Sequence, residues 1–212
     1  MIEPERMRRL LTDHEPSASE LLRRSLDAMP SRNRDAWLDS VLGIDAFASD
    51  GPDLPPGCVP YIPCMADLII QAVDRAQITN RDVFVDIGSG IGRATALTHL
   101  LTGAGAIGIE IQADLVRRSR ILAESLNTSR LVTVEGNATE LVKFIQIGTV
   151  FFLYCPFSGK QLERVVDDLG QIAVTRPIRV CCVQLPAIHR PWLELISPET
   201  SELLIYRSLA AT

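Results

Sequence analysis

The sequence predicts an α/β fold in which a doubly wound, mostly parallel sheet follows a helical extension. Three observations favour it. From residue 64 onward, segments with helical periodicity alternate with short apolar runs. These runs are apolar throughout, which is typical of strands buried on both faces of a parallel sheet. The segments between them are long enough for right-handed helical crossovers, so both faces of the sheet are expected to carry helices.

Residues 1–63 are expected to form a helical extension that ends in a proline-rich arm. Ser17 and Glu20 have the spacing of a capping box, and Leu22 and Leu26 then fall on one helical face. The text GIDAFASDGPDLPPGCVPYIP follows, and its prolines and glycines exclude a regular helix. We therefore predict one domain over residues 64–212 with this extension ahead of it.

Within residues 64–212, helices and strands are expected to alternate up to a terminal antiparallel hairpin. The apolar residues of the first helix fall on one face, and strand-like and helix-like segments alternate after it, which gives the order of elements. The expected elements are a helix over 65–73, the strand VFVDI, a helix through Leu97 and Leu100, the strand AIGIE, a helix around Leu115 and Leu122, the strand LVTVEG, a brief helix from Thr139, the strand TVFFLY, the strand in IRVCCVQLP and the hairpin WLELISPETSELLIYRS.

Composition restricts the classes of function. The formal net charge of -5 argues against a large nucleic-acid surface, which requires clustered Lys and Arg. No apolar run approaches the roughly 20 residues that span a bilayer, and the charged start is unlike a signal peptide, so we expect a cytoplasmic protein without membrane contact. The five cysteines contain no CxxC pair, which predicts reduced thiols and no metal site.

The stretch VFVDIGSGIGRA, residues 83–94, has the order strand, glycine turn, helix that is typical of a nucleotide-binding loop. Gly88 and Gly90 allow a positive φ or a close approach to a ligand. An ordinary turn is the alternative explanation. Glu110 ends the next strand, close to the roughly 20-residue offset at which a carboxylate binds a ribose diol. For Glu110 the alternative is a solvated charge at a strand end.

Asp86, just before the turn, favours S-adenosylmethionine over a dinucleotide. A dinucleotide places a doubly negative pyrophosphate on the glycine turn, where a nearby carboxylate repels it. S-adenosylmethionine has no phosphate and carries a cationic sulfonium and an α-ammonium group. Two opposite unit charges about 4 Å apart attract by about 4 kcal/mol at an effective dielectric near 20. The charge pattern therefore predicts the methyl donor.

The motif VDIGSGIG followed by GIEI resembles class I S-adenosylmethionine-dependent methyltransferases, which have a Rossmann-like sheet, over roughly residues 60–210. The segment VPYIP with DVFVDIGSGIGR is similar to small bacterial and mitochondrial lysine methyltransferases. It is more distantly similar to nucleosomal-lysine methyltransferases without a SET domain. The resemblance implies in-line methyl transfer from S-adenosylmethionine to an unidentified acceptor, such as a protein lysine or a small-molecule amine or hydroxyl.

The resemblance also implies roles for the residues of the glycine loop and the second strand. Asp86, Gly88 and Gly90 would contact the methionine portion of the cofactor. Glu110 would accept hydrogen bonds from both ribose hydroxyls, since an ionised carboxylate is acceptor-only. Ile111 would offer an apolar edge to the adenine.

Three further residues complete the cofactor site that the resemblance implies. In VEGNATEL, Asn137 and Ala138 occupy the place of an aspartate that accepts from the adenine amine. A helix cap is the alternative for Asn137, since Asn is a favoured N-cap residue. Tyr61 is the candidate for closing over the methionine end, and a packing role is its alternative.

The stretch FFLYCPFSG is expected to face the methyl group. Methyltransferases of nucleobases and glutamine have a motif like N-P-P-Y there. Tyr154 stands in place of the amide, which disfavours those acceptors. The Tyr154 hydroxyl could accept from an ammonium, and Phe157 could wall the pocket or contact a cation through its face. Plain packing is an equal alternative for Tyr154 and Phe157.

Two other classes of function stay open from the sequence. A non-catalytic module that binds S-adenosylmethionine or a protein partner would share the loop, and the unusual Tyr154 keeps this class open. A nicotinamide-dependent oxidoreductase would share the loop and Glu110. Asp86 opposes it, and no Tyr-x-x-x-Lys pair is present for proton delivery.

Overall fold

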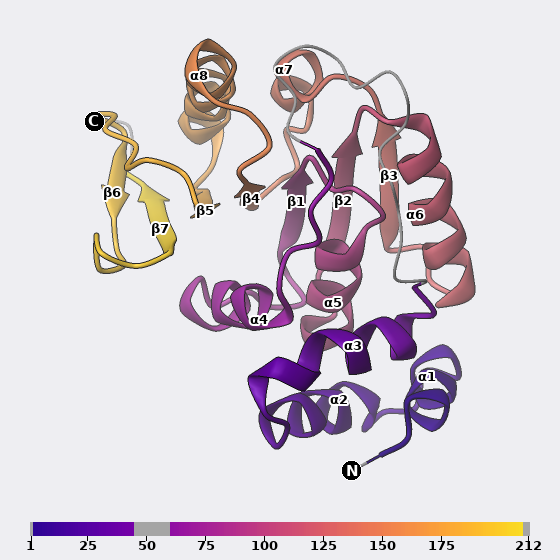
Figure 1. The fold of residues 1–212 in the computed structure, drawn as a ribbon. Coiled ribbons are helices and arrows are strands. Elements are labelled where there is room, and N and C mark those ends of the chain that lie inside the picture. Colours follow the sequence, from indigo (N-terminus) through magenta and orange to yellow (C-terminus); the bar gives the residue numbers. More distant parts are fainter. Residues whose placement is uncertain (1, 45–59, 210–212) are drawn as a thin grey trace.

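The computed structural model describes residues 2–44 and 60–209. Within these residues a seven-stranded sheet has the order β3-β2-β1-β4-β5-β7-β6 (Figure 1). Strands β1 to β5 are parallel, whereas β7 is antiparallel to both β5 and β6. The predicted α/β class, the mostly parallel sheet and the terminal antiparallel hairpin are confirmed. The bounds are β1 Val83–Ile87, β2 Gly105–Glu110, β3 Leu131–Glu135, β4 Val150–Tyr154, β5 Arg179–Val183, β6 Leu193–Leu195 and β7 Leu203–Ser208.

Helices cover both faces of the sheet because its strands alternate two sets of buried side chains. Phe84 and Phe152 belong to one hydrophobic cluster, and their neighbours Val85 and Phe151 belong to the other. The first face carries α4 Ala66–Arg75, α5 Arg93–Thr102 and α6 Ala113–Ser125; the second carries α7 Ala138–Leu141, the 3-10 turn Val142–Phe144 and α8 Gly159–Thr175.

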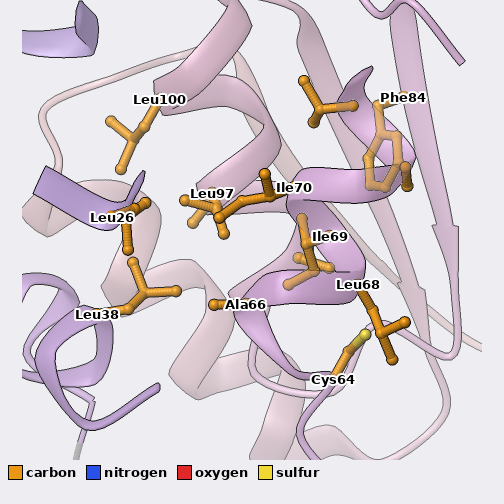
Figure 2. Close-up of a cluster of buried hydrophobic side chains, with 14 of the residues drawn as sticks. Leu26, Leu38, Cys64, Ala66, Leu68, Ile69, Ile70, Phe84, Leu97 and Leu100 are labelled. Atoms are coloured by element: carbon orange, nitrogen blue, oxygen red, sulfur yellow. The ribbon is translucent and has the colours of Figure 1, made fainter. Parts of the chain in front are cut away.

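The N-terminal helices share a hydrophobic core with the first face of the sheet. Of the helices α1 Pro4–Thr12, α2 Ala18–Asp27 and α3 Ser31–Leu42, α2 packs against α5 and α3 against α4, and α1 packs against α2 and α3 (Figure 1). Leu26 and Leu38 extend toward Ala66 and Leu97 in Figure 2 and belong to the same cluster. The boundary between residues 63 and 64 stays a prediction, and residues 45–59 of the proline-rich arm lie outside the described residues.

The capping box predicted at Ser17 does not form. Ser17 is the N-cap of α2, but its side chain makes no capping hydrogen bond. Its φ of -90° and ψ of -2° are helical, whereas a capping side chain needs the extended backbone of a regular N-cap. The helix itself is confirmed, with Leu22 and Leu26 buried as expected.

Two further features of the described residues are the character of the helices and the state of the cysteines. Among the described helices, none combines the length and apolar character that crossing a membrane requires. Cys64, Cys155, Cys181 and Cys182 are free thiols.

Candidate active site

The glycine turn after β1 permits two close approaches. Gly88 has a φ of +83° and Gly90 a φ of +54°, both in the region that favours glycine. A Cβ on Gly88 would lie 2.9 Å from Cβ of Pro156, and a Cβ on Gly90 would overlap the ring of Tyr61. The turn is therefore held between the segment before α4 and the loop after β4.

Glu110, at the end of β2, holds this turn through its carboxylate. Oε2 accepts from the backbone N–H of Gly90 at 2.8 Å, and Oε1 accepts from Ile111 and Gln112 at 2.8 and 2.9 Å. The side chain is 6% exposed, which excludes the alternative of a solvated strand-end charge. Three N–H donors offset much of the cost of burying the carboxylate.

Asp86 lies beneath the turn and does not line the cleft described below. It is 3% exposed, and burial, followed by the nearby Glu110, raises its pKa to about 8. Gly90 is also outside the lining, since the Tyr61 ring lies against it. The contacts of Asp86 and Gly90 with the methionine portion stay predictions.

A cleft of about 900 Å³, open space at its mouth included, lies at the carboxyl edge of the sheet. At β1 the strand order reverses, because β2 lies on one side of β1 and β4 on the other. Open α/β sheets bind ligands beside the carboxyl ends of the strands at such a point. The cleft brings together eight of the ten residues expected at the site: Tyr61, Gly88, Glu110, Ile111, Asn137, Ala138, Tyr154 and Phe157.

Asn137, on the β3 side of the cleft, is the N-cap of α7. Its Oδ1 accepts from the backbone N–H of Thr139 at 3.0 Å and from its hydroxyl at 2.8 Å. The helix-cap explanation of Asn137 therefore matches its hydrogen bonds. Ala138 is buried beside it, so this end of the cleft is apolar on one wall.

The opposite end of the cleft follows β4 and β5, and its backbone is strained. Cys155 has a φ of +42° and Gln184 a φ of +53°, although neither is glycine. Such conformations cost about 1–3 kcal/mol each and are common at functional sites. Tyr154 is half-buried in this end and Phe157 is buried in its wall.

Gln184 connects this end of the cleft to an acidic residue that the sequence did not single out. Its Nε2 donates to Oε1 of Glu202 at 3.0 Å, and its backbone N–H donates to the Glu202 carbonyl. Burial is the main cause that raises the pKa of Tyr154, followed by Cys64 and then by Glu202. The sequence contained a signal for Gln184. It directly follows the apolar run of β5, in the same way as Cys155 directly follows β4. Glu202 had none, since its position depends on the pairing of β7 with β5.

Glu110 is the only Asp or Glu among the described residues that line the cleft, and none of these residues is Lys, Arg or His. A bound pyrophosphate would find no cationic side chain among them. A cationic ligand would meet a carboxylate and neutral polar groups instead. The electrostatics of the described lining therefore favour a cationic, phosphate-free ligand.

Arg93, the first residue of α5, is a buried part of the site region that sequence reasoning missed. It forms ion pairs with Asp35 and Asp39 of α3 and donates to the carbonyl of Cys64. A cation at the first position of a helix opposes the helix dipole, and this placement directly after a glycine turn was the available signal.

Comparison with known proteins agrees with this geometry. Residues 60–147 match the family model described as histone methylation protein DOT1. The matched segment contains β1 to β3 with the glycine turn and Glu110. No curated protein matches the chain.

Several solved methyltransferase structures share the fold. An RNA methyltransferase from Salinibacter ruber, in complex with S-adenosyl-L-homocysteine, is 22% identical, with a TM-score of 0.50, over 69% of this chain and 92% of that chain. The putative methyltransferase yhhF from Escherichia coli is 18% identical, with a TM-score of 0.58, over 74% and 91%. A putative caffeoyl-CoA O-methyltransferase from Staphylococcus aureus is 12% identical, with a TM-score of 0.53, over 71% and 85%.

Proposed function

From the family-model match over residues 60–147 and the shared fold, we propose that the chain is a class I S-adenosylmethionine-dependent methyltransferase and that it methylates the side-chain amine of a protein lysine. S-adenosylmethionine is the cofactor of this superfamily. The mouth of the cleft beside Tyr154 is the observation that supports an amine acceptor.

The residues of the cleft fit this cofactor. Gly88 lines the cleft without a side chain, and Oε2 of Glu110, which accepts one backbone N–H, keeps one lone-pair site for a hydroxyl donor. We propose that Ile111 and Ala138 flank the adenine, beside the Asn137 cap. Bound S-adenosylmethionine supplies a methyl group that its sulfonium has already activated. The protein therefore has mainly to align the acceptor and exclude water.

An amine acceptor is supported by the polar groups at the mouth. Tyr154 and Gln184 line it, and Glu202 is hydrogen bonded to Gln184. No ion pair within 4.0 Å neutralises Glu202 among the described residues, so its carboxylate is available to attract an ammonium. The ammonium must lose one proton before its nitrogen attacks, and water at the open mouth can take it.

The name of the matching family model points to the same class of acceptor, since it concerns histone methylation. We propose a protein lysine in general, because the resemblance to bacterial and mitochondrial lysine methyltransferases is the nearer one. We also propose a cytoplasmic location, since the described cysteines are free thiols, as a reducing compartment keeps them.

The test is to incubate the protein with labelled S-adenosylmethionine and a cell lysate, and to fractionate the products. We expect label in protein, recovered as methyl-lysine after acid hydrolysis. Glu202→Gln should lower the rate several-fold without changing cofactor affinity. Glu194→Gln is the matched control, because Glu194 lies on the same hairpin and pairs with Arg207, outside the cleft lining. Label in RNA or small molecules alone would contradict the proposal.

A further inference from the structure

The guanidinium of Arg93 is buried at the N-terminus of α5, where the helix dipole disfavours a positive charge. Acidic residues of the N-terminal helices balance this charge. The Arg93 side chain is 4% exposed at the first position of α5. It donates to Oδ1 of Asp39 at 2.7 Å and to Oδ1 of Asp35 at 2.8 Å. Both carboxylates come from α3, so the N-terminal helices supply the negative charge that this buried cation requires.

The same guanidinium also fixes the segment that enters α4. Arg93 donates to the carbonyl of Cys64, and Oδ1 of Asp35 accepts from the backbone N–H of Ala66 at 2.8 Å. Ala66 is the first residue of α4, where backbone N–H groups lack helical partners. One cluster of three side chains thus joins α3, the start of α4 and the start of α5.

The segment held in this way carries Tyr61 onto the glycine turn. We call residues 60–65 the Tyr61 segment. The Tyr61 ring lies directly against Gly90 and lines the cleft, three residues before the carbonyl that Arg93 binds. Pro63 restricts the backbone between these points, so fixing Cys64 limits where the ring can lie.

We propose that Arg93 is a positioning residue through which the N-terminal helices hold the Tyr61 segment against the glycine turn and so complete the cofactor cleft. This inference rests on the proposed function only in naming the cofactor as the ligand. It gives the N-terminal helices a part in cofactor binding, although none of their residues lines the cleft.

The test compares two ion pairs of the same layer. Asp39 pairs with Arg93 at 2.7 Å, and Asp67 pairs with Arg34 of α3 at 2.7 Å; both aspartate side chains are 29% exposed. Asp39→Asn weakens the ion pair between α3 and Arg93, which binds the Tyr61 segment. Asp67→Asn weakens an ion pair between α3 and α4 that does not include Arg93 or the glycine turn. A purely structural role for Arg93 predicts the same behaviour for both variants.

Two readouts are measured on each variant. For Asp39→Asn we expect faster hydrogen exchange at the amides of residues 61, 62 and 64–66 and a Kd for S-adenosylhomocysteine raised at least fivefold by titration calorimetry. For Asp67→Asn we expect a Kd within twofold of the original protein. We also expect Asp39→Asn to add little to Tyr61→Ala, because both changes remove the same contact.

Unchanged exchange at residues 61–66 in Asp39→Asn, or equal losses of affinity in Asp39→Asn and Asp67→Asn, would overturn the inference. The exchange measurement needs no ligand. If the unaltered protein fails to bind S-adenosylhomocysteine while the exchange difference is present, the proposed function fails and the positioning role of Arg93 stands.

Discussion

The two ends of the cleft are built in different ways. At the β2 and β3 end, a buried carboxylate binds three backbone N–H groups and an asparagine caps a helix. At the β4 and β5 end, Cys155 and Gln184 have positive φ values, and Gln184 is hydrogen bonded to the exposed Glu202, which directly precedes β7. One end is fixed by regular hydrogen bonds, and the other by strained turns after regular strands.

This difference corresponds to what each end is proposed to recognise. The proposed cofactor is one defined molecule, and a carboxylate with defined backbone partners suits such a constant ligand. Acceptors differ between relatives, and loops at strand ends can change without altering the sheet that supports them. The following substitutions test the division, from the largest expected effect to the smallest.

Glu110→Gln should weaken binding at the cofactor end most. An amide keeps the size but turns an N–H₂ group toward backbone donors, so we expect a loss of about 1.5–3 kcal/mol in S-adenosylhomocysteine binding. A lower melting temperature should accompany it, since the carboxylate also holds the turn. Glu135→Gln is the control, because Glu135 is the register partner of Glu110 on β3 and is exposed. Equal losses in both variants would remove Glu110 from the site.

Gly90→Ala tests the contact between the turn and Tyr61. The added methyl group overlaps the Tyr61 ring, so cofactor affinity should fall about tenfold, or about 1.4 kcal/mol. Gly103→Ala is matched for backbone strain, with a φ of +72°, and its Cβ would meet only Asn80 at 3.3 Å. Both variants should lose about 1–2 kcal/mol of stability. A similar affinity loss in Gly103→Ala would assign the effect to strain alone.

Asp86→Asn tests the buried carboxyl beneath the turn through its pH dependence. The folded protein keeps the proton of Asp86 up to a pKa of about 8, whereas the unfolded chain releases it near 3.8. The contribution of Asp86 to stability therefore declines as pH rises between these values. At pH 8 the asparagine variant should be more stable, by roughly 1–3 kcal/mol in denaturant unfolding.

The same variant should bind the cationic cofactor more weakly at pH 8, by a fewfold, because it cannot ionise. In the original protein, affinity should increase from pH 6.5 to pH 8.5 as Asp86 loses its proton, and the variant should lack this increase. Parallel pH profiles in titration calorimetry would show that Asp86 does not contact the charged part of the ligand.

Asn137→Ala should have the smallest effect. Loss of the N-cap should cost about 1 kcal/mol of stability, and Asn137→Asp should restore it, since aspartate is also a favoured cap. Cofactor affinity should change by no more than about twofold, because Oδ1 is engaged by Thr139. A tenfold loss in Asn137→Ala that aspartate does not restore would assign Asn137 to direct adenine binding.

The predicted residues that line the cleft follow from the local order of strands and turns along the chain. Gly88 and Glu110 could be placed in the cleft because a strand, a turn and the next strand bring them to one edge of the sheet by local geometry alone. Apolar runs such as VFVDI identified the strands of the sheet, because a strand that is buried on both faces needs apolar residues at almost every position.

The parts that were missed depend on distant pairing. Arg93 meets Asp35 and Asp39 across 58 and 54 residues, and no periodicity connects them. Gln184 meets Glu202 only because β7 inserts between β5 and β6, whereas the sequence predicted the hairpin without its place in the sheet. The cap at Ser17 failed for a local reason, since the turn before α2 holds its backbone in a helical conformation.

The core shared by the N-terminal helices and α5 also has a consequence for synthesis on the ribosome. Leu26 and Leu38 leave the exit tunnel dozens of residues before Leu97, which belongs to the same buried cluster. Until α5 follows, these leucines lack much of the surface that covers them in the finished protein, and the nascent chain presents an apolar face on which chaperones act. The first three helices therefore acquire their final packing only after the glycine turn has been translated.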